Sequence, residues 1–173
     1  METINIDALP KDYNEYEIIK PLFNNWFLDV QFKYKSKYKN TKYLRDFVEV
    51  ICDIAWMSDK TKSRIVLISD ELNNNAIEYG SNHNGINYLR IKIEKQKKDI
   101  FLNLEVEDNW KWKKHKTALD METMRAHQLK LWYFNHDSIR WRWLFLITVK
   151  IVDRLYFKNS KDWWLIVWIK TKI

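Results

Sequence analysis

Apolar and polar residues along the first part of the chain follow two different periods. In residues 27–35 they alternate with a period of two, which predicts a strand. In residues 41–56 the apolar positions recur at i, i+3, i+4, i+7, i+8 and i+11, which predicts an amphipathic helix with Thr41 as its N-cap. A second helix is predicted to begin at Asp59 or Thr61 and to run to residue 79, with Gly80 as its stop.

The second part of the chain contains further strand patterns and one long polar segment. Apolar residues alternate in residues 89–93 and 100–106, and the short connection between them predicts an antiparallel pair. Residues 109–140 are polar and basic with only a weak helical pattern at 119–131, so we expect them to form a lid. The last predicted elements are a buried helix and two strands, over residues 144–152, 155–158 and 165–172.

This order of elements predicts the fold class. Strand, helix, helix, strand, strand, lid, helix, strand, strand favours a two-layer α/β sandwich, in which helices cover one face of a mixed sheet. The 173 residues fit a single domain, which we expect to span residues 27–173. Residues 1–26 contain both prolines and are expected to be an N-terminal extension with one short helix near residues 13–20.

Composition narrows the class of protein further. Hydrophobic residues make up 46% of the chain and charged residues 31%, as in globular proteins. No apolar run has the length of a membrane helix, and the N-terminus lacks the pattern of a secretory signal. Cys52 is the only cysteine and falls on the apolar stripe of the first helix, so we expect a core thiol. These features together predict a cytoplasmic protein without membrane contact.

The net charge of +7 is compatible with an anionic nucleotide, an acidic partner or a nucleic acid. The densest basic cluster lies in the expected lid without any recognised nucleic-acid motif, so we expect a loop that faces solvent or phosphate. Nucleic-acid binding is the weaker alternative. The four histidines have no spacing typical of zinc sites and are expected to be exposed. The basic cluster consists of Lys111, Lys113, Lys114 and Lys116.

Three segments carry candidate chemistry. Glu71 and Asn75 are four residues apart in a predicted helix, so they lie on one face, where a carboxylate can act as general base and oxygens can bind Mg²⁺. The alternative interpretation of this pair is an exposed polar face. Asp108 follows a predicted strand and can accept a hydrogen bond from an exocyclic amino group. Residues 138–157 form a loop that enters a helix, a junction that presents backbone N–H groups to phosphate.

Tryptophan stands where two of these segments need small residues. Backbone that approaches a base or a phosphate closely is usually glycine. A chain of this length is expected to contain about 12 glycines. This one contains 2 glycines and 10 tryptophans, which together equal that expectation. The tryptophans in the candidate loops and near the C-terminus are Trp110, Trp112, Trp141, Trp143, Trp163 and Trp164.

When these tryptophans are replaced by glycine, the sequence resembles a known family. The segments DELNNNAIEYG, VEDNGKGKK and SIRGRGLFLITVKIVDRLYF then follow the order and spacing of the boxes of the GHKL ATPase superfamily, over residues 27–173. The resemblance is most specific to the anti-sigma regulatory factors, which are serine/threonine protein kinases of partner-switching systems. It implies a Bergerat (GHKL) fold with an ATP lid.

The resemblance also implies a role for each matching residue. Asn75 would bind the Mg²⁺ that bridges the phosphates of ATP, Glu71 would be the catalytic base, and Asp108 would accept from the adenine amino group. The implied partners are an anti-anti-sigma (STAS-type) protein that carries the acceptor serine, a sigma factor, and a second copy of the chain in a homodimer. The loops that would surround the nucleotide contain Trp110 and Trp112, and Trp141, Arg142, Trp143 and Leu144.

Two further questions concern the tryptophans and the class of activity. We hypothesise that the gene contains UGA codons that its own cell reads as glycine and that the written sequence reads as tryptophan. The hypothesis extends to Trp56, which falls at a predicted helix end, and to Trp132 and Trp168. The alternative is that some tryptophans, Trp26 above all, are genuine core aromatics. Taken literally, the indoles would block ATP binding.

Two alternative activities are compatible with the same resemblance. One is a nucleotide-gated binding module without kinase activity. The other is the catalytic domain of a histidine kinase, which the short segment before residue 27 disfavours.

Overall fold

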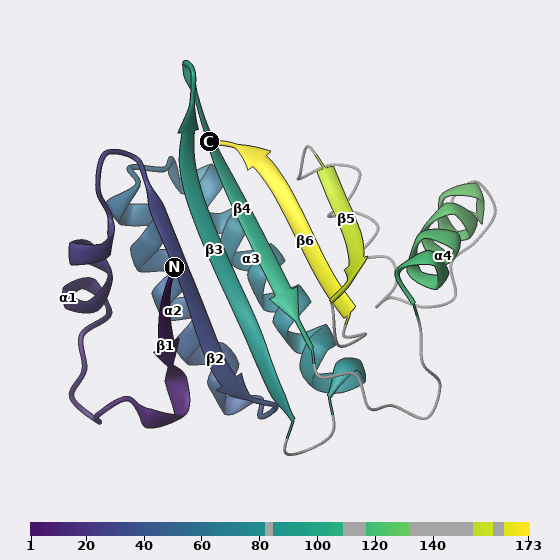
Figure 1. Ribbon diagram of the computed structural model, residues 1–173, viewed down its shortest axis with the longest axis horizontal. Coiled ribbons are helices and arrows are strands. Elements are labelled where there is room, and N and C mark those ends of the chain that lie inside the picture. Colours follow the sequence, from purple (N-terminus) through teal and green to yellow (C-terminus); the bar gives the residue numbers. More distant parts are fainter. Residues whose placement is uncertain (82–84, 109–116, 132–153, 161–164) are drawn as a thin grey trace.

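A six-stranded mixed sheet forms the centre of the molecule (Figure 1). The computed structural model describes residues 1–81, 85–108, 117–131, 154–160 and 165–173. The strands lie in the order β1-β2-β3-β4-β6-β5; β1 pairs with β2 in parallel and every other pair is antiparallel. Their bounds are β1 Glu2–Asn5, β2 Leu28–Lys35, β3 Ile86–Gln96, β4 Asp99–Glu107, β5 Arg154–Asn159 and β6 Leu165–Lys172.

The period-two pattern of the central strands corresponds to one buried and one partly exposed face. In β2 the residues at 28, 30, 32 and 34 are buried and those between them are half-buried. The same alternation continues in β3 and β4, which pair antiparallel across a two-residue turn. The predicted strand at 27–35, the predicted hairpin and the two predicted last strands are therefore confirmed, each within a few residues of its expected bounds.

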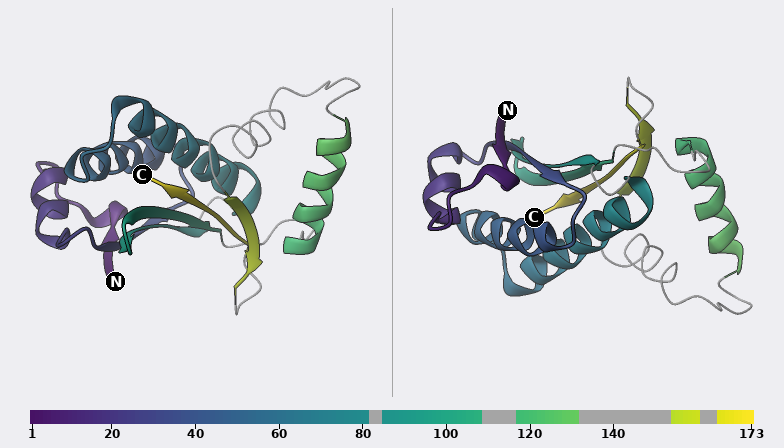
Figure 2. Two further views of the ribbon diagram at one scale, coloured as in Figure 1. Left: turned by 90° about the horizontal axis from the view of Figure 1, so that it is seen from above. Right: turned by 90° about the horizontal axis from the view of Figure 1, so that it is seen from below.

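Helices α2 (Lys39–Ile54) and α3 (Asp59–Asn75) lie side by side on one face of the sheet (Figure 2). Their apolar stripes pack onto the buried residues of β2, β3 and β4 and complete one hydrophobic core. Cys52 is fully buried in this core, and burial raises the pKa of its thiol to about 12. The prediction of an α/β protein with a mixed sheet and a core cysteine is confirmed.

The ends of the two helices differ from the sequence prediction in detail. Helix α2 begins at Lys39 after Tyr38, so the prediction of Thr41 as its N-cap was wrong. The Thr41 hydroxyl donates to the Tyr38 carbonyl oxygen at 2.7 Å inside the first turn, where it cannot cap the helix. Helix α3 begins at Asp59, with Ser58 as N-cap, and continues past Asn75 into a π-helical turn, η3 (Ala76–Gly80).

The first 26 residues, expected to be an extension, pack against the domain. Strand β1 forms one edge of the sheet beside β2, and two 3₁₀ turns, η1 (Ile6–Ala8) and η2 (Lys20–Leu22), flank the short helix α1 (Glu15–Ile19). Ile6 and Ile19 are buried in the core. The predicted short helix near residues 13–20 is therefore present, and the segment around it contributes both a strand and core side chains.

The other edge of the sheet is formed by β5, which contacts helix α4 (Ala118–Leu131) (Figure 1). This helix corresponds to the weak helical pattern within the expected lid. The remainder of that lid and the buried helix predicted at 144–152 lie outside the described residues. Among the helices of the described part of the chain, none combines the length and apolar character of a membrane span.

Candidate functional site

Glu71 and Asn75 lie one turn apart in the last part of α3. Both are half-buried, whereas Ile68 and Leu72 are buried in the core. The helix therefore holds its apolar side against the sheet and leaves a carboxylate and a carboxamide partly accessible. Oxygen ligands of this kind suit Mg²⁺, which keeps several waters when it binds to proteins.

The environment of Glu71 makes its carboxylate more basic than an ordinary glutamate. Burial is the main cause of its raised pKa, and the negative charge of Asp70 adds to the effect. Asp70 itself faces another way, because the Arg45 Nε of α2 donates to its Oδ2 at 2.7 Å. A raised carboxyl pKa brings a group closer to the operating range of a general base. Glu71 is therefore suited to accept a proton from a hydroxyl group.

Asp108 directly follows β4 and is buried. Its backbone N–H donates to the Leu165 carbonyl oxygen at 3.3 Å, which ties the end of β4 to the beginning of β6. The backbone of Asp108 is thus held between two strands, and the end of β4 and the C-terminal end of α3 lie toward the same end of the sheet (Figure 1). Helix α3 and strand β4 are in contact. The three described residues of the predicted site accordingly belong to two neighbouring elements.

A buried network that the sequence analysis missed connects α3 with β2. The Tyr34 hydroxyl of β2 donates to Asn73 Oδ1 of α3 at 2.6 Å, and Asn73 Nδ2 donates to the Ser69 carbonyl oxygen at 2.8 Å. All three side chains are buried. Burial raises the pKa of Tyr34, the negative charge of Asp108 raises it further, and a hydrogen bond with Asn87 lowers it. Tyr34 therefore links the helix of Glu71 to β2.

Two sequence signals could have revealed this network. Tyr34 occupies a position of β2 that alternation assigns to the core, and its hydroxyl group requires a partner there. Asn73 lies two residues from both Glu71 and Asn75, on the opposite side of the helix. An asparagine on the buried side of a helix and a tyrosine on the buried face of a strand are natural partners, but their separation of 39 residues hides the pairing.

Asn87 places a further polar group at the same end of the sheet. It pairs with Tyr34 in the β2–β3 register, and its side-chain oxygen accepts from the Ser81 hydroxyl. The Asn87 side chain is fully buried, and its amide interacts with the Tyr34 hydroxyl, which lowers the Tyr34 pKa, although Nδ2 forms no hydrogen bond of good geometry with the described residues. Asn87 therefore extends the buried polar cluster from Tyr34 to Ser81.

The remaining predicted site residues lie outside the described part of the chain. They are Trp110, Trp112, Trp141, Arg142, Trp143 and Leu144, together with the lid lysines at 111, 113, 114 and 116 and the tryptophans at 163 and 164. The structure therefore describes the carboxylate and carboxamide part of the candidate site and not its expected phosphate loops. Within the described residues, no group of three or more His, Cys, Asp or Glu side chains could hold a metal ion.

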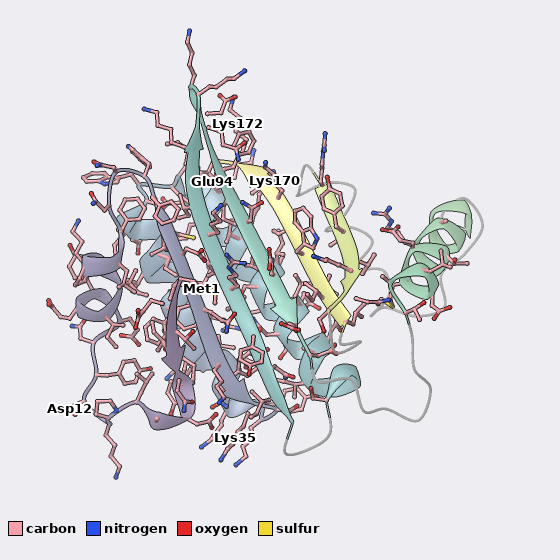
Figure 3. The ribbon with its side chains drawn as sticks, in the orientation of Figure 1. Met1, Asp12, Lys35, Glu94, Lys170 and Lys172 are labelled. Atoms are coloured by element: carbon pink, nitrogen blue, oxygen red, sulfur yellow. The ribbon has the colours of Figure 1, made fainter. Side chains whose placement is uncertain are left out.

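Charged side chains also gather on the sheet face that the helices leave open, but at a different end. Figure 3 shows Glu94, Lys170 and Lys172 near the β3–β4 turn, away from the end of β4 that precedes Asp108. Their charges are engaged locally: Lys92 Nζ contacts Glu94 Oε2 at 2.5 Å, and Lys172 Nζ contacts Asp99 Oδ1 at 2.6 Å. Lys170 Nζ lies over the Phe101 ring, 4.4 Å from its centroid, so each of these lysines has a local partner on the sheet.

The described fold defines the class of the protein: an α/β protein with a six-stranded mixed sheet, covered on one face by two helices. The described residues of its candidate site lie on α3 and directly after β4. No protein-family model matches the chain, and no curated protein matches it. A functional assignment therefore depends on the residues of the candidate site.

Proposed function

We propose that the protein is an ATP-dependent serine/threonine kinase of the anti-sigma-factor type, with a GHKL fold. The observation that carries the proposal is the arrangement of Glu71 and Asn75 one turn apart on α3, a helix that contacts β4, which the buried Asp108 directly follows. This arrangement supports a site in which the Glu71 carboxylate accepts a proton and the Asp108 carboxylate binds the adenine base.

Each described residue has a distinct part in the proposed reaction. Asp108 accepts from the adenine amino group, and the Asn75 side-chain oxygen is a ligand of Mg²⁺. Glu71 accepts the proton of the serine hydroxyl as the serine oxygen forms its bond to the γ-phosphorus and the bond to the ADP oxygen breaks. The raised pKa of Glu71 supports this part. Bound Mg²⁺ supplies positive charge to the phosphates, and positioning accounts for most of the catalysis.

The proposal requires glycine in the loops that meet the nucleotide. Two indole side chains in each loop, at positions 110 and 112 and at 141 and 143, would exclude the close backbone approach that phosphate and base binding need. We expect the chain with glycine at these four positions and at 163 and 164 to bind MgATP. The chain with tryptophan at all six is expected to bind it weakly or not at all.

A transfer assay tests the proposal directly. The glycine-containing chain is incubated with Mg²⁺, ATP that carries a radiolabelled γ-phosphate, and an anti-anti-sigma protein as the phosphate acceptor. Label is expected on a serine of that partner. Glu71→Gln removes the proton acceptor and is expected to lower transfer at least about 100-fold, in the range of general-base catalysis, with ATP binding retained. Glu49→Gln on α2 is the matched control and is expected to leave transfer unchanged.

The other outcomes separate the alternatives. ATP binding without transfer to any partner would contradict the kinase and favour a nucleotide-gated binding module. Label on a histidine of the chain itself would favour a histidine-kinase type of reaction. Failure of the glycine-containing chain to bind ATP, with its fold intact by circular dichroism, would overturn the nucleotide site altogether.

A further inference from the structure

Positive φ angles point to glycine at two positions outside the candidate nucleotide site. Among the described residues, the non-glycine residues with positive φ are Asn25, Trp26, Trp56 and Lys97. The described part of the chain contains the tryptophans at 26, 56 and 168, and two of these three therefore adopt the left-handed conformation. Tryptophan is poorly suited to that region, because its Cβ approaches the backbone carbonyl oxygen closely.

Trp26 is the second central residue of a tight hairpin turn. Asn24 and Phe27 exchange two backbone hydrogen bonds, of 3.0 Å and 2.8 Å, across the loop formed by Asn25 and Trp26. The two loop residues have φ angles of 48° and 60°, which is the signature of a type I′ turn. The sequence most typical of this turn is Asn-Gly. The chain supplies the asparagine at 25 and has tryptophan where the glycine belongs.

Trp56 is the C′ residue of a complete Schellman motif at the end of α2. Its backbone N–H donates to the Asp53 carbonyl oxygen at 3.0 Å, and the Met57 N–H donates to the Cys52 carbonyl oxygen at 3.0 Å. Trp56 has a φ of 53°. The C′ position of this motif is usually glycine. The Trp56 side chain is 86% exposed, so packing of the indole provides no compensation for the unfavourable backbone.

Trp168 differs from both positions. It lies in β6, where an extended backbone suits an aromatic residue, and its ring stacks on Tyr156 with the centroids 4.1 Å apart. The structure thus gives a backbone reason for glycine at 26 and 56 and gives none at 168. Positive φ is therefore not a feature of every described tryptophan, but is confined to the two that lie in turns.

We infer that residues 26 and 56 are glycine in the protein that its own cell makes. This inference does not depend on the nucleotide site, because neither residue belongs to the loops that would contact ATP. It rests on two turn types with different hydrogen bonds in different parts of the fold. Both support a codon that is read as glycine in the cell and as tryptophan in the written sequence.

Paired substitutions in the full chain test the backbone argument. Trp56→Gly and Trp56→Ala both remove the indole, and only glycine removes the Cβ. We expect the glycine variant to have a folded-to-unfolded ratio about 5- to 30-fold higher than the alanine variant, measured by urea unfolding. The same order is expected for the two variants at Trp26. The order should reverse at Trp168, where glycine weakens a strand. Alanine as stable as glycine at both 26 and 56 would overturn the argument.

The identity of the residues is read directly from the natural source. We expect UGA codons at positions 26 and 56 of the gene, and peptides of the native protein whose masses contain glycine at both positions. UGG codons, or native peptides with the mass of tryptophan, would overturn the inference whatever the stability measurements show. Neither readout involves ATP, so this inference and the proposed kinase activity can fail separately.

Discussion

Glu71, the proposed catalytic base, lies in an environment that disfavours its own negative charge. Its carboxylate is half-buried on α3, where desolvation and the neighbouring Asp70 charge both disfavour the ionised form. Asp29 on β2 shows the opposite balance, because the Arg90 guanidinium donates to both of its oxygens, at 2.8 Å and 2.9 Å, and lowers its pKa. One carboxylate is thus held in an unfavourable environment, and the other is stabilised by a direct partner.

We predict that Glu71→Gln stabilises the fold at neutral pH. The folded pKa of Glu71 lies above its ordinary value of 4.5, so the folded state binds more protons and loses stability as pH rises through this interval. The variant lacks this loss. Its advantage in the free energy of unfolding should therefore be largest at pH 7 and should disappear below about pH 4. Urea unfolding of both chains across this pH range measures the difference.

Asp29→Asn is the control, because it is expected to lower the free energy of unfolding at neutral pH where Glu71→Gln raises it. The folded pKa of Asp29 is lowered, so its ion pair stabilises the protein above the ordinary pKa of 3.8 and the benefit is lost as pH falls. The asparagine variant should be less stable than the parent at neutral pH and should approach it in acid. Equal pH profiles for the two variants would contradict the difference in environment.

At the scale of elements, the Tyr34–Asn73 hydrogen bond attaches α3 to β2. It crosses from the sheet to the helix inside the core, and it holds the segment of α3 between Glu71 and Asn75 at a defined depth. Apolar packing alone would allow a helix to slide or rotate slightly at small cost, whereas a buried hydrogen bond specifies one arrangement. The position of the candidate site therefore depends on a contact between elements and not on α3 alone.

We predict that Tyr34→Phe destabilises the protein by about 1–3 kcal/mol, because it leaves the buried Asn73 oxygen without its donor. Chemical denaturation measures the change. Tyr16→Phe on the exposed side of α1 is the matched control and should change stability by less than about 0.5 kcal/mol. If both variants were equally stable, the hydrogen bond would have no part in attaching the helix.

At the scale of the whole molecule, binding of the proposed ligand should raise the free energy of unfolding. A ligand that binds only the folded state raises the free energy of unfolding in proportion to the logarithm of its concentration. The candidate site is formed by α3 and the end of β4, which are separated in sequence by β3, so it exists only when the sheet and its helix layer are assembled. Nucleotide binding should therefore stabilise the entire domain.

We predict that MgATP at about 100 times its Kd raises the stability of the glycine-containing chain by about 2.7 kcal/mol. The chain with tryptophan in the six loop and C-terminal positions should show no such increase. Asp108→Asn in the glycine-containing chain should reduce the effect, because an amide NH₂ would face the adenine amino group. Thermal or urea unfolding with and without MgATP measures all three. Stabilisation of the tryptophan chain to the same extent would contradict the requirement for glycine.

The sequence by itself determined the elements whose patterns are local. The strands at 28–35 and 86–107 and the helices that carry Cys52 and Glu71 follow from apolar spacing within each segment, because the period of the side chains is set by the geometry of the element. The placement of Glu71 and Asn75 on one helix followed for the same reason. The N-cap of α2 could not be predicted in this way, because the position of a cap depends on where the incoming chain turns and not only on the residue type.

Only the tertiary structure decided how those elements meet. It attached residues 2–5 to β2 as a parallel strand, joined Tyr34 to Asn73 across 39 residues and linked the backbone of Asp108 to that of Leu165. It also showed that Trp26 and Trp56 occupy turns that require positive φ. Such features depend on the path of the backbone and on contacts between distant segments. A pattern that repeats within one helix or strand contains no information about either.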